Sequence, residues 1–117
     1  MTEIAQVTVT PFEEGIIKDG NAHPIGWRYA NITTDTTTEV KAGSGVLHSI
    51  TINTPVASSI INLYDNTAAS GTLIGTITLP ATLLSDGAKT AIYDVAFATG
   101  LTIKTTTGAS DITVSYI

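Results

Sequence analysis

The sequence predicts an all-β protein, an antiparallel β-sandwich of the jelly-roll or Greek-key type. Three observations lead to this fold class. Apolar and polar residues alternate along most of the chain, β-branched residues are abundant, and short groups of Gly, Ser, Asn and Asp separate the alternating segments. No segment has the 3.6-residue apolar spacing of an amphipathic helix. The 117 residues are enough for one domain that buries its own core.

Six segments carry the alternation, and each is predicted to be a strand. In order they are GVLHSITIN, SIINLYD, GTLIGTITLP, KTAIYDVAFATG, GLTIKTT and SDITVSYI. The residues expected in the core recur in them with a period of two: Val46, Ile50, Ile52, Leu63, Ile77, Val95, Phe97, Ile103, Ile112 and Val114.

The alternation also assigns faces within single strands. In GVLHSITIN, Val46 and His48 are expected on the core face and Leu47 on the opposite one. In GTLIGTITLP, Leu73 is expected on the same face as Ile77, and the proline ends the strand. Residues 81–89, ATLLSDGAK, are the one segment that could form a single helical turn. We interpret them as a loop, because Gly87 interrupts the segment and Ser85 with Asp86 suits a turn.

Residues 63–72, LYDNTAASGT, raise the question of whether Asp65 and Asn66 form a site or only a turn. Asp and Asn side chains bond to backbone groups about two residues ahead, and Gly71 permits a left-handed residue before the next strand. We therefore interpret the segment as a turn. The alternative is a metal or sugar site on Asp65 and Asn66, for which no second polar cluster is visible. KAGSGVL, residues 41–47, lacks the spacing of a phosphate-binding loop and is also interpreted as a turn.

The N-terminal third differs in composition from the remainder. It mixes glycine, proline and charged residues with the single tryptophan of the chain. We interpret residues 1–38 as an N-terminal arm or edge segment, with Trp27 and Tyr29 as anchors, and residues 39–117 as the sandwich body. The alternative is that residues 1–38 are the first hairpin of one continuous domain.

Charge and composition exclude several classes of partner. The formal net charge is −5, and the few basic residues are scattered, which argues against a nucleic-acid partner. No apolar stretch approaches the length that spans a bilayer, and the N-terminus lacks the pattern of a secretory signal, so we expect synthesis in a cytoplasm and no membrane partner. Absence of cysteine removes disulfides and thiolate sites.

No catalytic, metal or cofactor site is predicted. The carboxylates do not have the spacing of a calcium loop, and the serines lack the nucleophile elbow of hydrolases. His48 lies mid-strand, where a packed or hydrogen-bonded histidine is the commoner outcome. NIT at residues 31–33 matches a glycosylation acceptor, which we interpret as accidental without a secretory signal. The protein is therefore expected not to be an enzyme.

Four blocks of the sequence resemble, in their order, a group of small virion accessory proteins of tailed bacteriophages, such as capsid decoration or head-fibre components. The blocks are GVLHSITINT, LYDNTAASGTLIGTITLP, YDVAFATGLTIKTT and SDITVSY, and the resemblance covers residues 39–117. It brings no catalytic residues and no cofactor with it. It implies a virion structural protein on the capsid exterior, made in the bacterial host cytoplasm, that binds the major capsid protein and bridges its subunits. The alternative function is a carbohydrate-binding or host-adhesion module of a phage fibre.

An interface is expected at the one place where anchor-type side chains are consecutive. Trp27, Arg28 and Tyr29 belong to the residue types that dominate interface energetics, so we expect them to form the capsid or subunit interface. The alternative is that Trp27 closes the end of the core. A homo-oligomer is expected, with a trimer preferred to a dimer, because three-fold positions are abundant on icosahedral shells.

Overall fold

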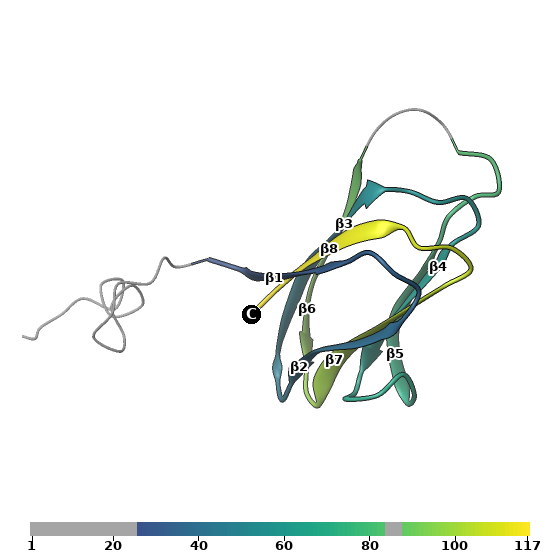
Figure 1. Cartoon of the computed structure of the whole chain (residues 1–117). Coiled ribbons are helices and arrows are strands. Elements are labelled where there is room, and N and C mark those ends of the chain that lie inside the picture. Colours follow the sequence, from purple (N-terminus) through teal and green to yellow (C-terminus); the bar gives the residue numbers. More distant parts are fainter. Residues whose placement is uncertain (1–25, 84–87) are drawn as a thin grey trace, which may run out of the picture.

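The computed structural model describes residues 26–83 and 88–117, which form two four-stranded antiparallel sheets packed together (Figure 1). The described residues include no helix, and the predicted all-β sandwich is confirmed. The strands are β1 (Arg28–Ile32), β2 (Thr37–Ala42), β3 (Gly45–Thr54), β4 (Ile60–Asp65), β5 (Thr72–Thr78), β6 (Lys89–Phe97), β7 (Gly100–Thr106) and β8 (Asp111–Tyr116).

The strand order is nested. One sheet has the order β1-β8-β3-β6 and the other β2-β7-β4-β5, so β1 pairs with β8, β2 with β7, β3 with β6 and β4 with β5. The chain therefore resembles one long antiparallel hairpin that is folded into two layers.

The predicted division after residue 38 falls inside β2, which spans Thr37–Ala42. Residues 28–38 belong to the sandwich, because β1 forms the edge of one sheet and β2 the edge of the other. The remainder of the predicted arm, residues 1–25, lies outside the described residues.

The hydrophobic core lies between the two sheets. Its buried residues are Ile32, Leu47, Ile50, Ile52, Ile61, Leu63, Phe97, Leu101, Ile103, Ile112 and Val114. Seven of the ten expected core residues are in this set, and two further ones, Ile77 and Val95, are half-buried against it. The alternation of β4, β7 and β8 was thus assigned to the correct face, since inward side chains recur at every second residue of a regular strand.

The expected face assignment is wrong at the start of β3. Leu47 is fully buried, whereas Val46 is only half-buried and lies outside the core cluster. The pairing of β3 with both of its neighbours shifts between Leu47 and Ser49. An extra residue at His48 therefore changes the phase of the alternation, so that Leu47 and Ile50 both point inward although they are three residues apart.

A second shift explains the wrong assignment of Leu73. The pairing of β4 with β5 is irregular between Leu63 and Tyr64, and Leu73, which pairs with Tyr64 after this irregularity, is 51% exposed.

Gly75 lies where the two sheets meet at their β5 and β6 edges. A β-carbon on Gly75 would come within 3.0 Å of the Tyr93 hydroxyl, so Gly75 leaves the space into which Tyr93 reaches from β6.

Candidate functional site

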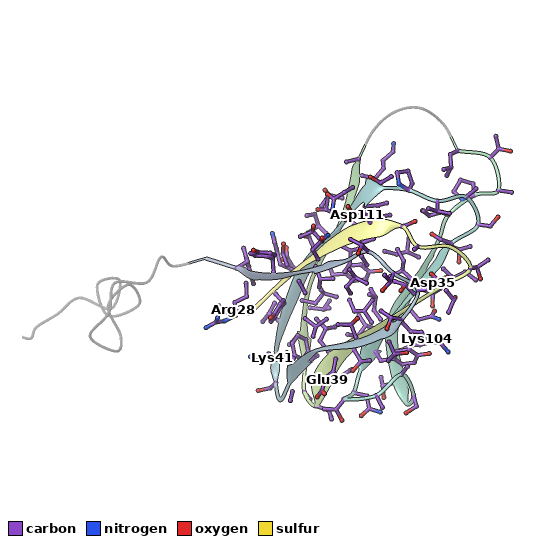
Figure 2. All side chains as sticks on the ribbon, in the orientation of Figure 1. Arg28, Asp35, Glu39, Lys41, Lys104 and Asp111 are labelled. Carbon is purple, nitrogen blue, oxygen red and sulfur yellow. The ribbon has the colours of Figure 1, made fainter. Side chains whose placement is uncertain are left out.

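The three predicted interface residues lie at the start of β1, an edge strand. Trp27 is 47% exposed and Tyr29 is 74% exposed, and Arg28 projects away from the sandwich (Figure 2). Ala30 and Ile32, at alternate positions of the same strand, pack in the core. Trp27 and Tyr29 therefore lie on the face of the sheet that is turned away from the second sheet. The alternative that Trp27 closes the core is wrong.

Trp27, His48 and Asp94 form a line of contacts across this sheet. The rings of Trp27 and His48 are stacked, with centroids 4.4 Å apart and an interplanar angle of 2°. On its other side His48 is hydrogen-bonded through Nδ1 to Oδ1 of Asp94 at 2.5 Å. Trp27 precedes β1, His48 is on β3 and Asp94 is on β6, so the three side chains connect the two edges of the sheet.

The irregular pairing of the sheet places His48 and Asp94 together. The extra residues are counted between two matched levels of the sheet. Between these levels β8 runs from Val114 to Tyr116, β3 from Leu47 to Ile50, and β6 from Ala91 to Val95. Thus β3 has one residue more than β8, and β6 one more than β3, which bends the sheet locally. The extra residue of β6 is accommodated at Asp94, which has a positive φ of 49°. Asp and Asn adopt this conformation more readily than most residues.

The pairing register arranges twelve outward-pointing residues of the four strands in three lateral rows, and the outward-pointing His48 and Asp94 lie between the first two rows. Trp27 and Ile117 each lie one residue beyond the Arg28–Tyr116 pair, and Ile117 exchanges backbone hydrogen bonds with Val46. In the order β1, β8, β3, β6, the rows are Trp27, Ile117, Val46, Ala96; then Tyr29, Ser115, Ser49, Ile92; then Asn31, Thr113, Thr51, Thr90. We call these twelve residues the outer face.

The twelve residues of the outer face are uncharged, although the Asp94 carboxylate lies between its first two rows and is 57% exposed. They include most of the large apolar side chains that are exposed in the described part of the chain. Of five large apolar side chains that are exposed there, Trp27, Tyr29, Ile92 and Ile117 belong to its first two rows, and Leu73 alone lies on the other sheet. By contrast, β2 and β7 of the other sheet carry charged side chains, Glu39, Lys41 and Lys104 (Figure 2). The apolar end of the outer face is thus a candidate binding surface.

The third row is joined to a polar network. Asp111 Oδ1 accepts hydrogen bonds from Nδ2 of Asn31 at 2.7 Å and from Nδ2 of Asn53 at 3.1 Å. Thr51 and Thr90 are linked through their hydroxyls at 3.0 Å. This end of the outer face is therefore held by amide and hydroxyl groups that fix one another's orientation.

The Asp65–Asn66 segment has a structural role. The Asp65 carboxylate accepts hydrogen bonds from the backbone N–H groups of Ala98, at 3.0 Å, and Thr99, at 2.8 Å, and so holds the turn between β6 and β7. These donors lower the pKa of Asp65 from its ordinary value. Asn66 closes its own loop by donating to the Ser70 carbonyl at 2.8 Å. The predicted turn is confirmed, although Asp65 binds a distant hairpin rather than a backbone group two residues ahead.

Other sequence-based candidates also take structural positions. Gly43 has a φ of 90°, as the turn interpretation of KAGSGVL requires. His48 is hydrogen-bonded, as expected of a mid-strand histidine. The second histidine, His23, lies outside the described residues. In residues 26–83 and 88–117, no three His, Cys, Asp or Glu side chains come close enough to hold a metal ion.

Sequence reasoning named Trp27, Arg28 and Tyr29 as interface candidates, and this stays a prediction. It did not name Ile92, Asp94 or Ile117, which lie on the same side of the sheet as Trp27 and Tyr29. Ile92 and Asp94 alternate with inward-facing residues of β6, and that alternation was visible in the sequence. Their position beside Trp27 was not, because it depends on which strands are neighbours.

The described part of the chain contains no helix long and apolar enough to cross a membrane.

Comparisons with known proteins give no match. No protein-family model, no curated protein and no solved structure matches this chain. The resemblance to phage virion accessory proteins therefore stays a prediction from the sequence.

Proposed function

We propose that this chain is a non-enzymatic structural protein of a bacteriophage virion. In this proposal it is a decoration or cement protein on the capsid exterior, made in the host cytoplasm, that binds the major capsid protein and bridges its subunits. It acts as a homo-oligomer, without a cofactor and without a nucleic-acid or membrane partner.

The observation that supports this proposal best is the composition of the outer face. Its first two rows combine aromatic and aliphatic side chains with serines, and they carry no charge. The central parts of protein interfaces are likewise enriched in aromatic residues and depleted of charge, because burial of an unpaired charge is costly. Association through this face buries Trp27 and Tyr29, and the carboxylate that lies between the rows, that of Asp94, is hydrogen-bonded to His48 rather than unpaired. The resemblance of residues 39–117 gives the shell context.

Binding to assembled particles tests the proposal. The full chain should co-sediment with shells of the major capsid protein of the same phage, in a fixed ratio of many copies per particle. The double variant Trp27→Ala with Tyr29→Ala should lower the occupancy strongly, whereas Leu73→Ala, an exposed apolar residue on the other sheet, should not. A chain that stays in the supernatant at saturating shell concentration would refute the shell function.

One observation favours the second candidate, a carbohydrate-binding or host-adhesion module. Trp27 and Tyr29 expose aromatic surface on the same side of β1, and Asn31 with Asp111 offers amide and carboxylate groups farther along the same side. Saccharides are commonly bound by such combinations of aromatic faces and fixed polar groups. A glycan array distinguishes the two functions: selective glycan binding that is lost in Trp27→Ala, without binding to shells, would favour adhesion.

A further inference from the structure

We infer that the free edge of β1 is a strand-addition site, and that its occupant is the segment of residues 4–10 of the same chain, which lies outside the described residues. This inference does not depend on the proposed virion function. It rests on the state of the four sheet edges, on the direction of the β1 backbone groups, and on the sequence that precedes β1.

Three of the four sheet edges in the described part of the chain carry irregularities that hinder the addition of a strand. The edge strands are β1 and β6 in one sheet and β2 and β5 in the other. The pairing of β6, β2 and β5 with their neighbours shifts register in each case, and β2 also carries Glu39 and Lys41. Such features disturb the regular row of backbone donors and acceptors that an added strand needs. By contrast, β1 pairs with β8 through five consecutive pairs without a shift.

The backbone groups of Tyr29 and Asn31 point away from β8. Ile117 and Val46 exchange two backbone hydrogen bonds of 2.9 Å, so the groups of Ile117 face β3. Successive residues of an antiparallel strand face opposite neighbours, so the residues of β8 that face β1 are Tyr116, Val114 and Ile112. Their partners on β1 are Arg28, Ala30 and Ile32. The N–H and C=O groups of Tyr29 and Asn31 are therefore directed to the free edge, where no described residue bonds to them.

The side chains of β1 determine what kind of strand fits beside it. Ala30 and Ile32 pack in the core, so an added strand needs apolar residues on this side of the sheet. Tyr29, 74% exposed, lies on the outer side, where a β-branched residue on the next strand is a favourable cross-strand neighbour of an aromatic ring. The site therefore favours an uncharged strand with an apolar residue at every second position.

The segment of residues 4–10, IAQVTVT, has this pattern. None of its residues is charged, and from residue 5 onward apolar and polar residues alternate, the apolar ones being Ala5, Val7 and Val9. Val and Thr are among the residues most enriched in strands, and the proline that follows the segment suits the end of a strand. With its apolar residues on the core side, the segment brings threonines to the outer side beside Tyr29.

The segment is tethered next to the site. The described chain starts at Gly26, two residues before β1, so residues 11–27 form the connection when residues 4–10 run antiparallel to β1. The free-energy cost of closing a flexible loop grows only with the logarithm of its length. A tethered strand also has an effective concentration on the order of millimolar. A contact that is too small to hold a separate molecule is therefore sufficient within one chain.

Amide hydrogen exchange of the full chain, followed residue by residue by NMR, tests for the added strand. The amides of Ala30 and Ile32 bond to β8 and should be protected in every variant. The amides of Tyr29 and Asn31 should be protected too, at all protein concentrations, because the added strand accepts from them. If these two amides exchange without protection, the inference is wrong. Protection that appears only at high concentration would show that a second copy takes the site, and would also overturn it.

Paired prolines test whether residues 4–10 are the occupant. Val7→Pro with Thr8→Pro removes a bonded N–H whichever of the two residues faces β1, and should raise the exchange rates of Tyr29 and Asn31 about tenfold or more. The control is Asn21→Pro with Ala22→Pro, between the segment and β1, which should leave these rates unchanged. Equal protection of Tyr29 and Asn31 in both variants would refute the assignment of the segment.

Disulfide formation tests which side of the segment faces outward. The chain has no cysteine, so Tyr29→Cys can be combined with one further cysteine at each position from 5 to 10. Adjacent residues of a strand point to opposite faces, so a disulfide within one chain should form with Gln6→Cys, Thr8→Cys or Thr10→Cys and not at the positions between them. Non-reducing mass spectrometry separates this product from a disulfide between two chains. Disulfides that form equally on both sides of the segment, only between two chains, or at no position would contradict the added strand.

Discussion

Truncation of Phe97 to alanine should cost about 3 to 5 kcal/mol of folding free energy. Phe97 is 2% exposed, and its ring lies within 2.7 Å of the position that a β-carbon on Gly45 would occupy. Loss of the buried ring removes about 1.5–3 kcal/mol of transfer free energy. A residual cavity of roughly 80 Å³, at about 24 cal/mol per Å³, adds about 2 kcal/mol. The two contributions together give the stated range.

Urea unfolding followed by circular dichroism measures this cost. The midpoint should fall while the slope with denaturant stays the same, and the thermal midpoint should drop by about 12 °C or more for a domain of this size. Leu73→Ala is the matched control, since Leu73 is 51% exposed and its truncation should change stability by less than about 0.5 kcal/mol. If Phe97→Ala costs less than about 1 kcal/mol, the placement of Phe97 in the core is wrong.

Three further changes test other parts of the structure. Gly45→Ala should destabilise the protein by about 1–3 kcal/mol in urea unfolding, because its methyl group would collide with the Phe97 ring and a backbone carbonyl; unchanged stability would show that the ring can move away. Ser110→Ala should cost about 1–3 kcal/mol, because it removes the buried hydroxyl pair with Ser59 and leaves a backbone N–H without its acceptor; Ser110→Gly with the same stability as wild type would contradict this. Asp65 has a lowered pKa, so its contribution to stability is fully present above the ordinary aspartate pKa and is lost progressively as the pH falls from there through the lowered value. Asp65→Asn should therefore lose less stability than wild type over this range, and parallel acid-unfolding profiles would refute the role of the carboxylate.

The sequence by itself determined the fold class and most of the core. Alternation with a period of two is a local property of an extended backbone, so Ile50, Ile52, Ile112 and Val114 could be placed inside a sandwich before any pairing was known. The same pattern could not place Leu47, because an extra residue in one strand can be recognised only from the register in which that strand pairs with its neighbours.

Only the tertiary structure decided which residues lie beside the predicted interface residue Trp27. Trp27 could be identified as an anchor from its chemistry, but His48 and Asp94 follow it by more than 20 and more than 60 residues, respectively. They meet because β1, β8, β3 and β6 are neighbours in one sheet, and the order of strands in a sheet is fixed by long-range hydrogen bonds. Asp65 shows the same dependence, since its backbone partners on the β6–β7 turn lie more than 30 residues away. The residue types were therefore visible in the sequence, whereas their arrangement as one face came from the packing of the whole chain.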